Sequence, residues 1–108
     1  MMKKWCLFLD DERTPKTRTD WVIARSVSKA ISLVEKNGCP FLISFDHDLG
    51  DQVPTGHNFA KWLIRQDQDG VICIPQCFSF DVHSANPAGR DNIISLMNSY
   101  LKFKNMKG

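Results

Sequence analysis

The sequence predicts an α/β domain with a short, mainly parallel sheet of about four strands between layers of helices. Nearly continuous apolar runs of strand length recur along the chain, and segments with helical spacing of apolar residues alternate with them. Such alternation is typical of parallel strands joined by right-handed crossovers. The chain has 108 residues, so we expect one domain spanning residues 1–108 around one hydrophobic core.

Four apolar runs of strand length predict the strands. The first and third are nearly continuous in apolar character, as strands buried on both faces are. Each stops where polar residues begin, so the carboxyl end of each strand is defined. In chain order the runs cover about residues 4–9, 21–24, 41–45 and 77–82.

Three helices are predicted between and after the later strands. The first has Ser26 or Ser28 as a cap and ends at Asn37-Gly38. The second begins at Thr55, and the third opens with Asn86-Pro87, a cap residue followed by proline in the first turn. The apolar positions, helix by helix, are Val27, Ala30, Ile31 and Val34; Phe59, Ala60, Leu63 and Ile64; and Ile93, Ile94, Met97, Tyr100 and Leu101.

Bulk composition limits the class of protein. With 14 basic and 12 acidic residues the net charge is +2, which is too balanced to indicate nucleic-acid binding. The four cysteines form no C-x-x-C pair, so we expect reduced thiols, with Cys6 and Cys73 packed as small hydrophobes, and a cytoplasmic protein. The first apolar run ends at Asp10, too early for a signal peptide or a membrane span, so no membrane partner is expected.

Acidic residues follow two of the predicted strands. Asp10-Asp11 ends the first, and Asp46-His47-Asp48 ends the third. Carboxyl ends of parallel strands meet at one edge of a sheet, where α/β folds bind ligands. Adjacent carboxylates repel each other unless a cation neutralises them, and Mg²⁺ prefers oxygen ligands. We therefore predict that Asp10, Asp11 and Asp46, or Asp48 in its place, hold Mg²⁺ or Mn²⁺.

Two histidines lie among these polar residues. Alternation along a strand end predicts that Asp46 and Asp48 share a side while His47 points away. A carboxylate near an imidazole fixes its tautomer and raises its pKa, which suits acid–base catalysis. His47, Asp48 and His83 are therefore the candidate catalytic residues. One histidine would take a proton from water and the other would protonate the leaving oxygen, in either order.

The segment around the last helix start favours phosphate. A helix N-terminus offers free backbone N–H groups, and Ser84 and Asn86 add neutral hydrogen bonds. Arg90 in the first turn, with Arg13 after the first strand, would bind phosphate oxygens. The sequence pattern therefore predicts four candidate substrate ligands, which are Arg13, Ser84, Asn86 and Arg90.

Together these motifs resemble receiver domains of response regulators, with an acidic pair, a later Asp and then Ser84 at successive strand ends. No strand carrying the receiver's lysine follows here. The chain is more similar to the cyclic-phosphate processing receiver domain family along nearly its whole length. That resemblance implies a receiver- or flavodoxin-like three-layer sandwich, a role on cyclic phosphates, and added site residues Arg25 and Thr55. The matching segments are Leu9 to Pro15, Arg25, Asp46 to Gly50, Thr55-Gly56 and His83 to Gly89.

The main functional hypothesis is a metal-dependent phosphoesterase that opens a cyclic phosphate. The substrate would be a phosphate-containing small molecule such as a cyclic nucleotide, or an RNA 2′,3′-cyclic end. A binding module that holds the same ligand without cleaving it is the alternative. Receiver-like signalling through Asp46 or Asp48 is a third, and the oligomeric state is left open.

Overall fold

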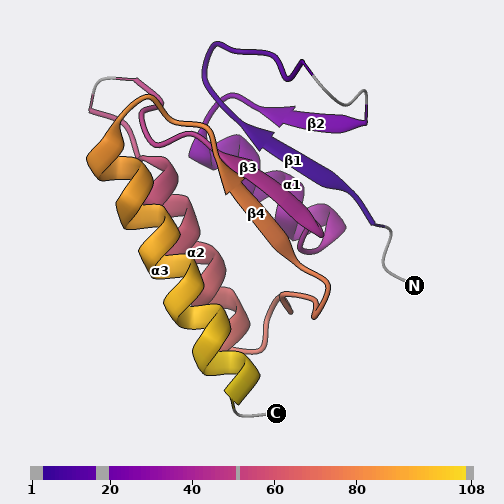
Figure 1. The fold of residues 1–108 in the computed structure, drawn as a ribbon. Helices are drawn as coiled ribbons and strands as arrows, with labels where there is room; N and C mark the ends of the chain where they lie inside the picture. Colours follow the sequence, from indigo (N-terminus) through magenta and orange to yellow (C-terminus); the bar gives the residue numbers. More distant parts are fainter. Residues whose placement is uncertain (1–3, 17–19, 51, 107–108) are drawn as a thin grey trace.

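The computed structural model describes residues 4–16, 20–50 and 52–106. Every predicted strand and helix is present, and three of the strands begin slightly later than the apolar runs do. The end of the loop after the first strand, at residues 17–19, lies outside the described residues. The elements are β1 (Cys6–Leu9), β2 (Trp21–Ala24), α1 (Val27–Asn37), β3 (Leu42–Phe45), α2 (Gly56–Gln68), β4 (Ser79–Val82) and α3 (Pro87–Met106) (Figure 1).

The four strands form one parallel sheet in the order β2-β1-β3-β4. Leu9 pairs with Phe45, which in turn pairs with Val82. Because these residues end their strands, the next residues of three neighbouring strands stand at one edge. The α/β receiver-like class predicted from the sequence is confirmed, and the strand ends meet as expected.

The helices form a single layer on one face of the sheet. The crossovers from β2 to β3 and from β3 to β4 run in the same direction, and right-handed crossovers of that kind place their helices on one face. α2 packs against both α1 and α3, and α3 lies beside β4 (Figure 1). The expectation of helices on both faces is therefore corrected: in the part of the chain that the structure describes, all three helices cover the same face.

Strand alternation divides the buried side chains between the two faces. Leu7 and Leu9, with Ile43 and Phe45, belong to the core beneath the helices. The intervening Phe8 and Ser44 point to the helix-free face, since successive side chains of a strand alternate. Phe8 and Ser44 are also buried. The helix-free face is thus not simply a solvated surface, and it lies next to the polar strand ends.

The cysteines and the expectation of no membrane span can also be compared with the structure. None of the four cysteines forms a disulfide, and Cys6 and Cys39 are buried. Cys73, however, is exposed, because the apolar run from Val71 to Ile74 is irregular rather than a strand, and within it only Ile74 is fully buried. Among the described residues, no helix has the length and apolar character needed to cross a membrane.

A polar network ties the segment after α2 to α3. The Asp67 carboxylate accepts hydrogen bonds from Tyr100 Oη, from Lys104 Nζ at 2.8 Å and from the Ile74 N–H at 2.8 Å. Burial opposes ionisation of Asp67, but these three donors outweigh it and lower the pKa of the carboxyl. Burial and Asp67 together raise the pKa of Tyr100 to about 12.

We expect Asp67→Asn to destabilise the fold by about 2 kcal/mol, because three partly buried donors lose a charged acceptor. A carboxyl whose pKa is lowered on folding stabilises above its unfolded pKa. The difference between wild type and variant should therefore shrink as pH falls below about 4. Urea denaturation at a series of pH values measures this, with the exposed Asp69→Asn as the matched control. A difference that grows in acid would contradict the network's role.

Candidate functional site

Two buried carboxylates and an imidazole meet at the ends of β1, β3 and β4. Asp10 is fully buried and Asp46 is 4% exposed. Together with the partly buried His83, each offers a ligand atom, and these atoms all lie within 4.8 Å of one another. Parallel register brings them together, since each residue directly follows a paired strand end. We call this group the acidic centre.

Asp10 is the most heavily bonded member of the acidic centre. Its Oδ1 accepts the backbone N–H groups of Glu12 and Arg13, both at 2.8 Å, which turns the chain sharply after β1. Its Oδ2 accepts from His83 Nε2 at 2.9 Å and from Arg13 Nε at 3.2 Å. Burial opposes ionisation, but these donors prevail and lower the pKa of Asp10. Asp10 therefore carries a negative charge in the interior.

Asp46 experiences the opposite balance. Burial, and then the charge of Asp10, raise the pKa of Asp46, although Arg13, His83 and a Ser84 hydrogen bond partly offset this. The Arg13 guanidinium reaches it at 3.8 Å from Asp46 Oδ2 while remaining 53% exposed. Arg13 is thus the cation that neutralises the acidic pair from its solvent side.

His83 is held on three sides. Its ring stacks on Phe8, with centroids 4.5 Å apart and an interplanar angle of 6°. Its Nδ1 lies 2.6 Å from Ser44 Oγ, while its Nε2 bonds Asp10. Sequence reasoning missed Phe8 and Ser44. Each stands two residues before an acidic residue of the centre, so strand alternation could have placed both on the same face.

His47 belongs to a second group, beside the acidic centre. Its Nδ1 bonds Asp48 Oδ1 at 2.8 Å, and Asn86 Nδ2 donates to the same carboxylate at 3.2 Å. The hydrogen bond from His47, followed by that from Asn86, lowers the pKa of Asp48. The prediction that Asp46 and Asp48 share a side is wrong. β3 ends at Phe45, so strand alternation does not extend to Asp48, which is exposed.

Two glycines let helix starts approach His47 and Asp46 closely. A Cβ on Gly56 would stand 1.9 Å from the backbone oxygen of Asp46, and the Gly56 N–H donates to the His47 carbonyl at 2.9 Å. A Cβ on Gly89 would stand 2.3 Å from the His47 ring. The N-termini of α2 and α3 therefore both abut His47, and their dipoles favour negative charge there.

The remaining predicted site residues lie around the acidic centre rather than in it. Arg25 braces the loop after β1, donating to the Arg13 carbonyl at 2.6 Å and to that of Asp10 at 3.2 Å. Thr55 forms a capping box with Asn58 at the start of α2, and Asn86 Oδ1 accepts from the Gly89 N–H at the start of α3. Asp11 is half-buried and outside the acidic centre, and Arg90 is exposed, 3.9 Å from Asp91.

The acidic centre suits a divalent cation in its chemistry. Two buried carboxylates with an imidazole form a mixed oxygen and nitrogen donor set, which favours Mn²⁺ more than Mg²⁺. Arg13 now supplies the positive charge that the pair requires. Asp10, Asp46 and His83 would hold the ion, and Arg13 would have to withdraw from Asp10.

The fold and the site define a receiver-like α/β domain with its acidic centre at the carboxyl ends of the strands. More specifically, the chain belongs to the family of the cyclic-phosphate processing receiver domain. The model of that family matches residues 5–99 of this chain. Among solved structures, a fusion protein carrying the trimeric coiled coil of yeast Spc42 aligns over 99% of this chain and 85% of that one. At 17% identity and a TM-score of 0.53, that likeness shows the fold alone. None of the curated proteins is significantly similar to this sequence.

Proposed function

We propose that this domain is a metal-dependent phosphoesterase that opens a cyclic phosphate, and that it works in the cytoplasm. The observation that carries the proposal is the buried Asp10 and Asp46 pair with His83 within 4.8 Å. Burying two carboxylates side by side is costly unless a cation is held there. Membership of a family associated with cyclic-phosphate processing adds the substrate class.

The acidic centre would hold Mn²⁺ or Mg²⁺, which supplies Lewis acidity and charge neutralisation at a phosphoryl group. Arg13, leaving the carboxylates, lies near enough to bind phosphate oxygens as a fork. Ser84 and the N–H groups at the start of α3 are further donors for those oxygens.

His47 is the better placed of the two histidines for proton transfer. Both ring nitrogens of His83 are engaged, one by Asp10 and one by Ser44. His47 has its Nδ1 fixed by Asp48, and no described residue bonds its Nε2. In the proposed reaction a water oxygen forms a bond to phosphorus, one ring P–O bond breaks, and His47 Nε2 takes the water's proton. The released oxygen takes a proton from solvent, to which His47 returns its own, so the product is an open phosphate monoester.

A panel of 2′,3′- and 3′,5′-cyclic nucleotides, with Mn²⁺, Mg²⁺ or EDTA, tests the proposal. We expect ring opening that EDTA abolishes and that His47→Gln lowers by about 10²–10⁴-fold, the usual contribution of an acid–base group. His57→Gln, a substitution at another histidine in the first turn of α2, is the comparison. Tight binding of a cyclic nucleotide without any product would instead make the domain a binding module.

Arg13→Gln is expected to strengthen Mn²⁺ binding. Arg13 competes with a metal for Asp10 Oδ2, and a half-exposed ion pair contributes up to about 1 kcal/mol, so the gain should be about fivefold. Calorimetric titration with MnCl₂ measures it directly. Arg90→Gln removes an equal charge near the same edge and should leave the affinity unchanged. Weaker Mn²⁺ binding by Arg13→Gln would show that the arginine does not compete.

A further inference from the structure

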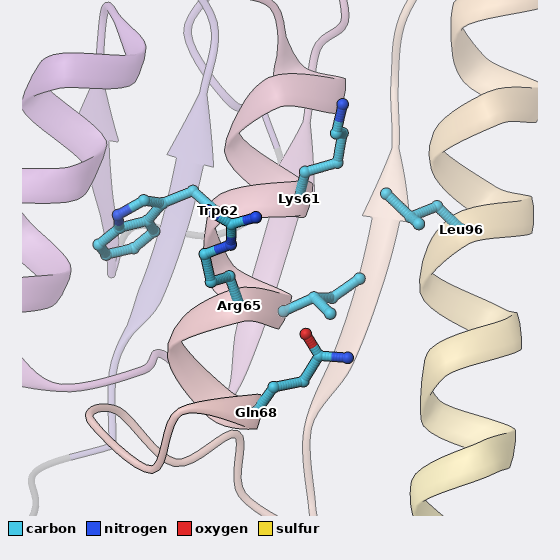
Figure 2. Close-up of a pocket in the computed structure, with 6 residues that line it drawn as sticks. Lys61, Trp62, Arg65, Gln68 and Leu96 are labelled. Atoms are coloured by element: carbon cyan, nitrogen blue, oxygen red, sulfur yellow. The ribbon is translucent and has the colours of Figure 1, made fainter.

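A groove between α2 and α3 starts at Lys61, in the second turn of α2, and runs along the helical layer. It has a volume of about 460 Å³ and is lined by Lys61, Trp62, Ile64, Arg65, Gln68 and Leu96 (Figure 2). Figure 2 shows Lys61, Arg65 and Gln68 following one another down α2, with Leu96 facing them from α3. Among these described lining residues there are two cations and no carboxylate. The groove is therefore positively charged, although the whole chain is nearly neutral.

The cations continue a line that starts at the site. His57, Lys61 and Arg65 are spaced four residues apart on α2, so they share a helix face and are separated by about 6 Å each. α2 itself begins with the Gly56 bond to the His47 carbonyl. Burial, Lys61 and His47 lower the pKa of His57, so His57 is a neutral link between the site and the two cations.

The groove also has an aromatic side chain at its rim, since Trp62 extends from α2 on the side away from Leu96 (Figure 2). Trp62 is half-buried and stacks on Phe59, with ring centroids 5.8 Å apart and an interplanar angle of 16°. An indole held in place by another ring, beside cations at regular spacing, is an arrangement with which proteins bind single-stranded nucleic acids. The bases stack on the aromatic ring, and the phosphates pair with the cations. A free mononucleotide bound at the strand ends would not reach Arg65, two helical turns from His57.

We propose that the substrate is the 2′,3′-cyclic end of an RNA strand, and that the groove between α2 and α3 holds the nucleotides preceding that end. This inference rests on the proposed function for the reaction at the cyclic end. Lys61 and Arg65 each pair with one backbone phosphate, and Trp62 stacks a base. Specificity for an RNA end over a free cyclic nucleotide then comes from the helical layer rather than from the acidic centre.

The test compares a short oligoribonucleotide ending in a 2′,3′-cyclic phosphate with the matching cyclic mononucleotide. We expect wild type to bind and turn over the oligonucleotide better. Replacing both Lys61 and Arg65 by Gln should lower binding and turnover of the oligonucleotide to the values for the mononucleotide. It should also make the log–log slope of binding against salt shallower by about 1.4, since each single-strand phosphate contact contributes about 0.7. Exchanging Lys29 and Lys36 of α1 for Gln removes the same charge elsewhere and should change neither result.

The outcomes separate the two proposals. Turnover of the mononucleotide with no advantage for the oligonucleotide overturns the groove and leaves the phosphoesterase intact. Salt-dependent RNA binding that requires Lys61 and Arg65, without any turnover, supports the groove and overturns the phosphoesterase. If the Lys61 and Arg65 variant behaves like the α1 control, the groove does not bind RNA. Displacement of RNA at lower concentration by an acidic amphipathic peptide would also overturn the proposal, in favour of a protein partner.

Discussion

Asp46→Asn should greatly weaken metal binding and turnover without weakening the fold. Asp46 is 4% exposed, and its carboxyl lies beside the charge of Asp10. An amide of the same shape removes that repulsion, so the free energy of unfolding in EDTA should be equal to or greater than that of wild type. Loss of one of two carboxylate ligands should lower Mn²⁺ affinity at least about 100-fold, with turnover falling in parallel.

The pH dependence of the free energy of unfolding provides a second test of this prediction. Burial and Asp10 raise the pKa of Asp46 in the folded state. A carboxyl with a raised folded pKa contributes stability that is present below its unfolded pKa, about 4, and is lost as pH rises through the folded value. Relative to Asp46→Asn, wild type should therefore lose stability over that window, so that the difference between the two proteins is greatest near neutral pH.

Two controls separate the roles of the carboxylates. Asp81→Asn removes an exposed charge from β4 and should leave metal affinity and turnover as they are. Asp48→Asn replaces the charged acceptor of His47 Nδ1 by a neutral amide, so it should lower turnover while keeping Mn²⁺ affinity. Full Mn²⁺ binding by Asp46→Asn would remove Asp46 from the metal site. A large loss of stability would show that its ionised carboxylate is needed for folding.

Gly56→Ala should be among the most damaging single substitutions in this chain. The added Cβ would stand 1.9 Å from the Asp46 carbonyl oxygen and 2.9 Å from its carbon. Neither backbone atom can move without separating β3 from α2, so we expect a loss of about 3 kcal/mol in urea denaturation. Mn²⁺ affinity should fall as well, because the displaced backbone carries an acidic ligand.

Two other glycines calibrate this result. Gly70 has a φ of 72° but open space around it, so Gly70→Ala should cost only about 1 kcal/mol of backbone strain. Gly89→Ala meets the His47 ring, a side chain that can turn away. It should therefore reduce turnover more than stability. If Gly56→Ala loses no more stability than Gly70→Ala does, α2 can shift to relieve the contact.

The sequence was informative wherever burial and chain order determine the outcome. Apolar runs ending in polar residues defined four strands, and parallel pairing then implied that Asp10, Asp46 and His83 would meet. It misled where the chain leaves regular structure. Alternation was extended past Phe45 to Asp48, although β3 had ended. It could not show that Arg13 would neutralise the acidic pair, because that contact depends on the turn made by Asp10 Oδ1.

The face of the sheet on which each helix packs could not be predicted from the sequence pattern either. Periodicity identifies an amphipathic helix but not the face of the sheet on which it packs. That choice follows from strand order, and a sheet ordered β2-β1-β3-β4 has both helical crossovers on one side. The groove between α2 and α3 follows from the same fact, since only helices on one face can lie side by side.

The connection from β1 to β2 has a consequence for how this protein can change over evolutionary time. Among its described residues it contains no helix, and it carries Arg13, with Arg25 just beyond β2. Substitutions there alter the charge presented to Asp10 and Asp46 without repacking the hydrophobic core. The proposed metal preference and ligand choice could therefore change by substitutions in one loop, with no change to the sheet and its three helices.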